Sequence, residues 1–299
     1  MNSPIAVFLY NRPQKTYNCL KSISLNYGFK DSPLYIFIDG PKNKTDMGEI
    51  EKIKKIIIAF NFNNLIELNI STVNKGLANS IYQGVQRVFK KHETIIVIED
   101  DLIFNKNFLN FLNKCLTKYL DKSIYQVSGH VWGEELKNQS NPVLIPNINS
   151  WGWATWRSKW KDFQLEKIKG EAVHNFDSKL IYKFNLESSY DYFKILKKQL
   201  QGKVDSWAIQ WYYHVFINQG YTIYPNTSLV ANKGMDGSGT HTISNKFSKN
   251  LDVDFKINYP DSISFDQKKF QKFCNDLKKA NNENLLDKIF IRVLRLLKK

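Results

Sequence analysis

Short apolar runs alternate with helix-like segments through the first half of the chain, and no other feature of the sequence constrains the fold as strongly. Each run is rich in β-branched and aromatic residues, and residues with helical periodicity follow it. The four runs are Ile5–Tyr10, Leu34–Ile38, Leu65–Ile70 and Thr94–Ile98. Strands that alternate with helices in this way form a mostly parallel sheet. The pattern therefore predicts an α/β fold with a mostly parallel central sheet.

Acidic residues stand at the ends of two of these predicted strands. Asp39 follows the second strand, and Glu99, Asp100 and Asp101 follow the fourth. The carboxyl ends of parallel strands meet at one edge of the sheet, where open α/β sheets bind ligands. Three adjacent carboxylates there predict a site for Mg²⁺ or Mn²⁺. We expect Asp39 to accept hydrogen bonds from a nucleotide base or ribose, with an ordinary turn aspartate as the alternative.

Two more segments fall at the same predicted edge. Arg12, in the sequence NRP, follows the first strand and can face a phosphate or a base, although a solvated surface arginine is the alternative. Lys75 and Gly76, in the sequence NKGL, open a predicted helix. Gly76 would allow the backbone to approach a nucleotide-sugar closely, with Lys75 beside it. A plain loop with a helix cap is the alternative for this segment.

The second half of the chain is less regular and richer in tryptophan. From about Tyr125 the pattern loosens into aromatic-rich loops, with helical segments near 176–200 and 206–218. A tryptophan ring offers a flat apolar face and one N–H donor, which suits a sugar ring as well as it suits a core. We therefore predict an acceptor-binding half here, with core packing as the alternative. The residues assigned to acceptor binding are Trp151, Gly152, Trp153, Trp156 and Trp207.

A carboxylate base and a flap complete the predicted site. If the ligand is a nucleotide-sugar, a hydroxyl of the acceptor attacks its sugar and expels the diphosphate. This reaction requires a group that takes up the proton of the hydroxyl. Asp205 is the candidate for this base, and a helix N-cap is its alternative role. A glycine-rich loop from Lys233 to His241 predicts a mobile flap over the ligand. We expect Lys233, Gly234 and His241 to take part in it, although a surface histidine is the alternative for His241.

The net charge and the cysteine spacing limit the kinds of partner and the cellular compartment that we expect. The 299 residues carry a formal net charge of +15, which favours phosphorylated or other polyanionic partners. The lysines are spread along the chain and no nucleic-acid-binding module is recognisable, so nucleic acid is not an expected partner. Cys19, Cys115 and Cys274 lie far apart without the spacing of a disulfide framework or a zinc site, which indicates a reducing cytoplasm. No apolar run reaches the roughly 18 residues that a membrane-spanning helix needs.

The sequence divides into two halves and a tail. We expect a nucleotide-sugar-binding half at 1–125, an acceptor-binding and catalytic half of the same domain at 126–260, and a helical tail at 261–299. The last 16 residues, 284–299, place apolar residues on one helical face with lysines and arginines beside them. This pattern predicts peripheral contact with an anionic membrane, with an ordinary docked terminal helix as the alternative.

Six motifs taken together resemble a known family. They are VIEDDL, the NRP start, NKGLANS, SWGWATW, VDSW and KGxxGxGTH. In order and spacing, from about residue 4 to residue 242, they resemble bacterial GT-A glycosyltransferases related to animal N-acetylglucosaminyltransferase I. The resemblance implies a GT-A nucleotide-sugar-binding fold with Mn²⁺ on Asp101, while Asp100 and Glu99 support ribose, base or metal-bound water. It also implies that Asp205 is the catalytic base and that Arg12 and Asp39 contact the nucleotide.

The chain departs from that family at Val204 and Ser206, where the family has a tryptophan and an aspartate, so acceptor contacts and sugar choice stay open. The expected function is metal-dependent, inverting transfer of a sugar from a nucleotide-sugar, UDP-linked, to a glycan or lipid-linked saccharide acceptor. We expect it in capsule or lipopolysaccharide assembly, at the cytoplasmic side of the membrane. The alternatives are a nucleotidyltransferase, a carbohydrate-binding protein on a degenerate transferase fold, and a basic membrane- or nucleic-acid-binding protein.

Overall fold

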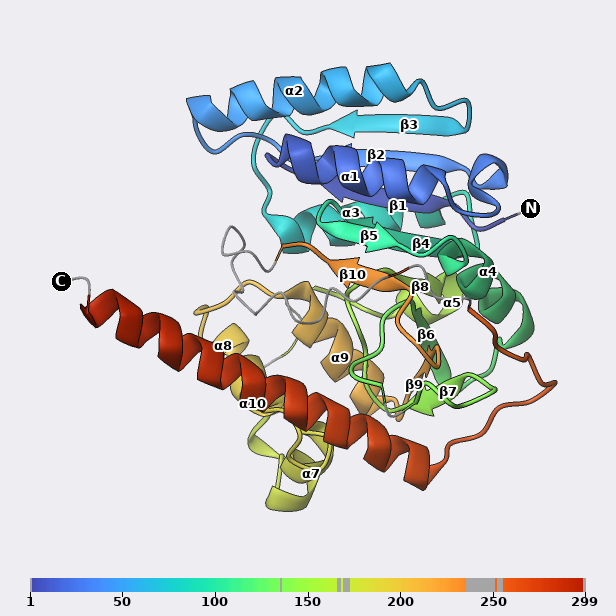
Figure 1. The fold of residues 1–299 in the computed structure, drawn as a ribbon, viewed down its shortest axis with the longest axis vertical. Helices are drawn as coiled ribbons and strands as arrows, with labels where there is room; N and C mark the ends of the chain where they lie inside the picture. The colour runs from blue at the N-terminus through green and yellow to red at the C-terminus, as the bar shows by residue number, and fades with distance from the viewer. Residues whose placement is uncertain are drawn as a thin grey trace.

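The fold is built around one eight-stranded sheet with the strand order β3-β2-β1-β4-β8-β6-β9-β7 (Figure 1). The computed structural model describes residues 2–134, 136–165, 168, 173–234, 251 and 255–297, with side chains only up to residue 282. The strands are β1 Ile5–Leu9, β2 Leu34–Ile38, β3 Leu65–Ile70, β4 Thr94–Glu99, β6 Ile124–Ser128, β7 Val143–Ile145, β8 Trp153–Trp156 and β9 Tyr221–Tyr224. β1, β2, β3 and β4 are mutually parallel, and β8 runs antiparallel to both β4 and β6. The predicted α/β class with a mainly parallel central sheet is confirmed.

Helices cover both faces of this sheet. The described helices are α1 Pro13–Ser24, η1 Phe29–Asp31, α2 Lys44–Phe60, α3 Leu77–Phe89, α4 Phe108–Lys118, α5 Arg157–Trp160, α7 Ser178–Phe184, α8 Tyr192–Leu200, α9 Trp207–Ile217 and α10 Gln267–Leu297. Helices α1, α2 and α4 share one hydrophobic core with the sheet, whereas α3, α8 and α9 share the core of the other face. A second, two-stranded sheet pairs β5, Leu102–Phe104, with β10, Val230–Asn232.

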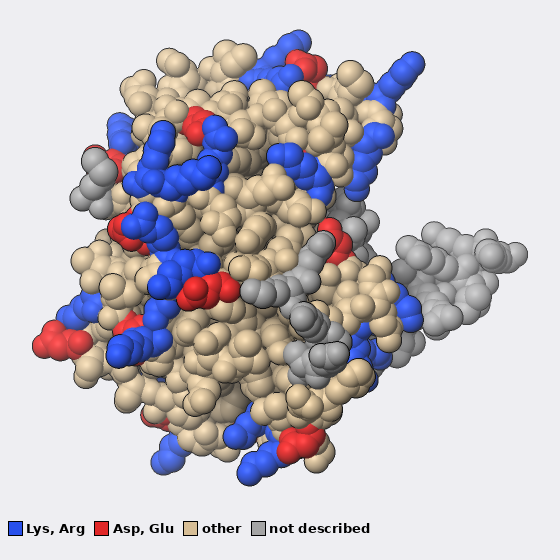
Figure 2. All heavy atoms as spheres, turned by 180° about the vertical axis from the view of Figure 1, so that it is seen from behind, with Lys and Arg blue, Asp and Glu red and all other residues tan. Residues whose placement is uncertain are grey.

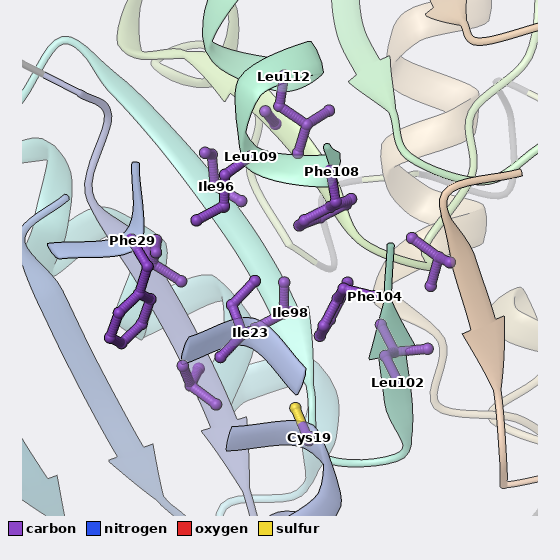
Figure 3. Close-up of a cluster of buried hydrophobic side chains, with 14 of the residues drawn as sticks. Cys19, Ile23, Phe29, Ile96, Ile98, Leu102, Phe104, Phe108, Leu109 and Leu112 are labelled. Atoms are coloured by element: carbon purple, nitrogen blue, oxygen red, sulfur yellow. The ribbon is translucent and has the colours of Figure 1, made fainter. Parts of the chain in front are cut away.

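Strand β4 shows why the acids emerge where they do. Its residues are buried from Ile95 to Ile98, because Ile96 and Ile98 enter one core while Ile95 and Val97 enter the other. Figure 3 shows Ile96 and Ile98 among the side chains of the first core, with Ile96 toward Leu109 and Ile98 toward Phe104. A strand that is apolar on both faces is typical of a central parallel strand. The polar chain that follows it leaves the sheet at the carboxyl edge.

The predicted strands of the first half are confirmed. Strands β2 and β3 have the predicted limits, β1 ends one residue earlier at Leu9, and β4 includes Glu99. The predicted helical stretch near 176–200 consists of two helices, α7 and α8. They are separate because residues 186–188 adopt positive φ angles of 48°, 54° and 61°, which no right-handed helix can contain.

The prediction of aromatic-rich loops after Tyr125 is wrong. Four strands of this region join the central sheet, and the sequence WATW forms β8, which pairs with both β4 and β6. A strand's side chains alternate between faces, so Trp153 packs in one core and Trp156 in the other. Both rings lie in the interior because β8 is a central strand.

The first turns of the C-terminal helix pack against the edge of the sheet. Phe270, Phe273 and Leu277 are buried in a third core together with residues of β7. Figure 1 shows the other end of α10 lying outside the body of the fold. The side chains from residue 283 onward lie outside the described residues, so the amphipathic pattern at 284–299 stays a prediction. Among the helices that the structure describes, none combines the length and the apolar composition needed to cross a bilayer.

Candidate active site

The predicted residues at the ends of β1 and β4 meet in space. Glu99 closes β4, and Asp100 and Asp101 form the turn into β5. Arg12, at the start of α1, donates from Nη1 to Asp101 Oδ2 at 3.1 Å and from Nε to Asp100 Oδ2 at 3.3 Å. Its Nη2 also pairs with Asp100. One guanidinium therefore holds the two aspartates of the turn, because β1 and β4 are neighbours in the sheet.

This cluster carries more negative than positive charge. When all are ionised, three carboxylates face one guanidinium, for a formal charge of −3 + 1 = −2. Burial, together with the charges of Asp101 and Asp100, raises the pKa of Glu99 to about 8. Burial also raises the pKa of Asp100, against the opposing effect of Arg12. With Glu99 protonated at neutral pH the formal charge of the cluster is −1, and a divalent cation bound there would favour ionisation of Glu99 and balance the resulting −2.

The oxygen donors suit a hard cation but do not form a complete cage. Within the part of the chain that the structure describes, no group of three or more His, Cys, Asp or Glu side chains is arranged to hold a metal ion. The side chain of Asp101 is 14% exposed and that of Asp100 is 3% exposed, so Asp101 is the more accessible ligand. Mg²⁺-type ions are commonly held by one or two carboxylates, with substrate phosphates and water completing the shell. The residues fit that kind of site.

The predicted flap begins on the acidic turn. The amide of Lys233 donates to the carbonyl of Asp101 at 2.8 Å. A Cβ atom at Gly234 would lie only 2.2 Å from Asp101 Oδ2, so a glycine is needed for this approach. Residues 235–250, which include His241, lie outside the described residues. The role of His241 therefore stays a prediction.

Asp39 has a structural task that the sequence reading left as the alternative. Its Oδ1 accepts hydrogen bonds from the amides of Gly40 at 2.8 Å and Lys75 at 2.9 Å. Its Oδ2 accepts from the amide of Gly76 at 3.0 Å and from Asn74 Nδ2 at 3.1 Å. Four donors use the acceptor capacity of one carboxylate. Asp39 therefore fixes the 74–76 loop, and direct nucleotide contact by this side chain stays a prediction.

Replacing Asp39 with asparagine should destabilise the protein. An amide has one acceptor oxygen, so two of the four donors would lose their partner in a side chain that is 8% exposed. We expect a loss of about 1–3 kcal/mol in the free energy of unfolding, measured by urea denaturation. Asp31→Asn, at an exposed position in η1, is the matched control. Equal stability of both variants and the wild type would contradict this role of Asp39.

Asp205 lies beside the same loop. The Asp205 side chain is exposed, and its Oδ2 would be 3.4 Å from a Cβ placed on Gly76. Gly76 has φ +77° and ψ 162° at the N-cap of α3, a backbone conformation that favours glycine. The N-cap of α9 is Ser206, whose hydroxyl accepts from the amide of Ile209. Asp205 is thus not used as a helix cap.

A cavity of about 360 Å³ adjoins the loop that Asp39 fixes. Its lining includes Asp39 and Lys75 at one end and Gln83 and Arg87 of α3 further along. Lys75 Nζ donates to Gln83 Oε1 at 3.0 Å, so its ammonium lies along α3. Ligand pockets commonly have volumes of about 300–1,000 Å³, so this cavity is at the small end of that range.

The tryptophans divide into interior and surface groups. Trp153 is 0% exposed, Trp156 3% and Trp207 3%, and the rings of Trp153 and Trp207 stack at 5.0 Å. A ring packed in the core cannot contact an acceptor that arrives from solvent, so these three are corrected to core residues. Trp151 keeps a partly exposed side chain, and Gly152, with φ +63°, packs against Phe108. Acceptor contact stays a prediction for Trp151 and Gly152.

Sequence reasoning missed a residue that supports Arg12. Asp46, in the first turn of α2, accepts from Tyr10 Oη at 2.7 Å and from Asn11 Nδ2 at 2.7 Å. These two hydrogen bonds lower the pKa of Asp46. Asp46 therefore braces the turn that presents Arg12. No local signal marks this contact, because 35 residues separate Asn11 from Asp46.

Comparison with known proteins bears on the activity. Residues 30–145 match glycosyltransferase family 25, described as LPS biosynthesis protein. The matched segment runs from η1 to the end of β7, less than half of the chain, and it includes Asp39 and the acidic turn. The match supports glycosyl transfer as the class of activity. A relation to N-acetylglucosaminyltransferase I is not shown.

Three solved structures are similar at low identity. The mannosyltransferase PcManGT from Pyrobaculum calidifontis, in complex with GDP-Man and Mn²⁺, has a TM-score of 0.45 and 10% identity over 73% of this chain and 68% of its own. GalNAc-T7 with UDP, GalNAc and Mn²⁺ has a TM-score of 0.49 and 11% identity over 78% of this chain and 44% of its own. S. aureus TarS has a TM-score of 0.45 and 13% identity over 78% of this chain and 61% of its own. The chain thus spans less than two thirds of the second and third structures. With TM-scores below 0.5, these similarities carry no argument about activity.

Proposed function

We propose that this protein is a metal-dependent, inverting GT-A glycosyltransferase that moves a sugar from a nucleotide-sugar, UDP-linked, to an acceptor glycan. The observation that carries the proposal is the cluster of Arg12, Asp100 and Asp101 at the carboxyl edge of the sheet. An anionic turn that is already paired with a guanidinium suits the diphosphate end of a nucleotide-sugar once a cation is bound. The match of residues 30–145 to a glycosyltransferase family supports the same reading.

Arg12 and Asp101 would act on the diphosphate. A divalent cation, when bound at Asp101, would take up the negative charge that develops on the departing diphosphate. Asp101 would be its main protein ligand. Asp100 and Glu99 would support the ribose, the base or metal-bound water. Arg12 orients Asp100 and Asp101 through its three N–H contacts at the carboxyl edge of the sheet, where a phosphate oxygen could share its guanidinium.

Asp205 would be the general base of the reaction. In a single displacement, the acceptor hydroxyl attacks the anomeric carbon on the face opposite the diphosphate, and a carboxylate takes its proton. Asp205 is exposed, is not used as a helix cap, and lies beside Gly76 at the N-terminus of α3. Asp39 fixes this loop through the amides of Lys75 and Gly76, and the fixed loop could position the donor beside Asp205.

A thermal-shift screen tests the proposal. The purified protein is heated with UDP-, GDP-, CMP- and dTDP-sugars, each with and without Mn²⁺, and hydrolysis of each nucleotide-sugar is followed in parallel. We expect one nucleotide class to raise the Tm, with the shift dependent on Mn²⁺ and reversed by EDTA. Absence of stabilisation and hydrolysis with every nucleotide-sugar would overturn the transferase proposal. Release of pyrophosphate from nucleoside triphosphates would instead favour a nucleotidyltransferase.

We also propose that the acceptor is a lipid-linked saccharide of a bacterial surface polysaccharide, reached at the cytoplasmic face of a membrane. The support is the net charge of +15 and the run of basic residues in 284–299. Figure 2 shows Lys and Arg spread over one face of the body rather than gathered in one block. The proposed membrane contact therefore rests on the basic and apolar pattern of the tail.

Charge reversal of the tail should abolish vesicle binding. The change replaces Lys288, Arg292, Arg295 and Lys299 with glutamate in the full chain. Each basic residue near an anionic surface contributes about 1 kcal/mol, so we expect at least a hundredfold weaker co-sedimentation with phosphatidylserine-containing vesicles. Reversal of Lys52, which is exposed, and Lys54, which is partly exposed, both on α2, is the control. Equal co-sedimentation of the tail variant and the wild type would contradict the membrane role.

A further inference from the structure

A groove runs along one flank of α3, between this helix and the two outer strands of the sheet. Helix α3 packs against β1, β4 and β2, whereas β3 is the edge strand. Asn69 of β3 is the register partner of Phe37 of β2, and Phe37 shares a core with α3, so both side chains lie on the α3 side of the sheet. The cavity of about 360 Å³ occupies this space.

The wall of the groove is a polar face of α3. Four polar residues of the helix line the cavity at spacings of three or four residues, which places them on one side of the helix. They are Ser80, Gln83, Arg87 and Lys90, the last at the C-cap. From Ser80 to Lys90 the helix rises about 15 Å. The groove is therefore elongated along α3.

Cations outnumber acids along the groove. The lining includes Lys75, Arg87 and Lys90 but only one acid, Asp39, which already accepts four hydrogen bonds from its own loop. Arg87 Nε pairs with Glu67 Oε1 at 2.5 Å. Lys75 and Lys90 have no carboxylate partner among the residues that the structure describes. An anion that enters the groove would therefore meet two ammonium groups that are not engaged by these acids.

Uncharged polar groups lie between the two lysines. The side chains of Asn69, Ser80 and Gln86 line the cavity and are partly exposed, and none of them hydrogen-bonds to another residue of the described chain. Gln83 Oε1 accepts from Lys75 Nζ at 3.0 Å, which leaves the N–H donors of Gln83 unused within the described residues. Amides and hydroxyls both donate and accept, as sugar hydroxyls do. The groove therefore suits a ligand that is anionic and rich in hydroxyls.

One end of the groove adjoins the candidate base. Lys75 lines the cavity and precedes Gly76, and Asp205 Oδ2 would be 3.4 Å from a Cβ on Gly76. Helix α3 runs from the end of β3 to the start of β4, so Arg87 and Lys90 lie toward the sheet edge opposite the acidic turn. A saccharide with one hydroxyl at Asp205 could thus continue along α3, whereas a diphosphate at the acidic turn stays at the carboxyl edge.

We propose that this groove binds an anionic segment of the acceptor saccharide, with sugar carboxylates or phosphates at Lys75 and Lys90 and sugar hydroxyls on the polar groups between them. The inference rests on the proposed glycosyl transfer and names the substrate class of its acceptor. The net charge of +15 attracts such a ligand, and the groove supplies its local contacts. A neutral saccharide would lack the ion pairs.

Two substitutions that add negative charge to the groove test the proposal. Gln83→Glu keeps the size of the side chain and its contact with Lys75 but adds a carboxylate, and Lys90→Glu reverses a cation. Lys91→Glu is the matched control, because Lys91 is exposed, adjoins Lys90 and does not line the cavity. Each protein is titrated by NMR with trigalacturonic acid, glucose 6-phosphate, maltotriose and inorganic phosphate, in the presence of EDTA and without nucleotide. The Mn²⁺-dependent Tm shift with the stabilising nucleotide-sugar is recorded in parallel.

We expect the wild type to bind trigalacturonic acid or glucose 6-phosphate in preference to neutral maltotriose. Both groove substitutions should weaken this binding at least about tenfold, because like charges placed opposite each other repel. Lys91→Glu should bind as the wild type does, and the Tm shift with nucleotide-sugar should be unchanged in every variant. Gln83 and Lys90 are exposed, so their substitution should leave the Tm of the free protein unchanged. Whichever anionic sugar binds identifies the charged group as a carboxylate or a phosphate.

Other results would overturn the proposal. The groove would not be an acceptor subsite if the wild type bound neither anionic sugar, or if the groove variants bound them as tightly as Lys91→Glu does. Inorganic phosphate bound as tightly as the sugars would indicate a general anion site, and loss of the nucleotide-sugar Tm shift in the groove variants would assign the groove to the donor. If the wild type neither binds nor hydrolyses any nucleotide-sugar, the proposed glycosyl transfer fails, whereas the saccharide titrations still decide whether the groove binds anionic sugars.

Discussion

Asp205→Asn is expected to lower kcat by about 10²- to 10⁴-fold, the usual contribution of a general base, with little change in nucleotide-sugar binding. The asparagine side chain has the same shape but cannot take up the acceptor proton. Because Asp205 is exposed and Ser206 caps α9, the substitution removes no helix-capping contact. The measurement is steady-state transfer or hydrolysis with the stabilising nucleotide-sugar, beside a thermal-shift titration of the same donor.

Asp191→Asn is the control for this prediction. Asp191 caps α8 through its side chain, and asparagine caps a helix about as well as aspartate. We expect this variant to keep both kcat and Tm. A kcat of Asp205→Asn within a factor of three of the wild type would exclude Asp205 as the base, and the search for it would move to other carboxylates of the crevice.

The second large effect is expected from Asp101→Asn. A cation bound at this site would stabilise the charge of the leaving group by several kcal/mol, and a loss of about 4 kcal/mol corresponds to roughly a thousandfold loss in kcat. The neutral amide also weakens cation binding, so the Mn²⁺-dependent rise in Tm with nucleotide-sugar should disappear. Arg12 keeps its two contacts with Asp100 in this variant, which limits the damage to the fold.

Asp261→Asn is the matched control for Asp101→Asn. Asp261 is fully exposed and pairs with Lys118 at the surface, where an ion pair contributes little to stability. It should retain the Mn²⁺ effect. A Mn²⁺-dependent Tm shift in Asp101→Asn equal to that of the wild type would contradict the metal role and leave the acidic turn as a partner of Arg12 only. A lower Tm of Asp101→Asn in the absence of any ligand would indicate that the contacts of Arg12 with Asp100 and Asp101 stabilise the fold.

The first half of the fold could be predicted from local pattern because each strand carries its own signal. A run such as Leu34–Ile38 is apolar throughout and all of its residues are buried, so composition and burial agree. In the second half the signal failed. The tetrapeptide WATW forms a short strand whose partners, β4 and β6, are distant in sequence, and its tryptophans favoured a binding loop over a core strand.

The same contrast holds for the candidate site. The sequence alone determined that Arg12, Asp39 and the acidic turn stand at strand ends, because parallel strands expose their carboxyl ends at one edge. It could not determine which side chains pair there. Strand pairing across long stretches of chain joined Arg12 to the acidic turn, and four hydrogen bonds committed Asp39 to its own loop.

His130 shows the limit most clearly. In the sequence it follows β6, a strand that was not predicted, and the two residues on either side of it are neither charged nor metal-binding. Only the tertiary structure surrounds it with Trp132 and Trp151 and places its Nδ1 at hydrogen-bond distance from Ser228 Oγ, 98 residues away. Local propensity and period therefore determined the layers and the chemical edge of this protein, whereas contacts between distant segments decided which groups there are paired and which are buried.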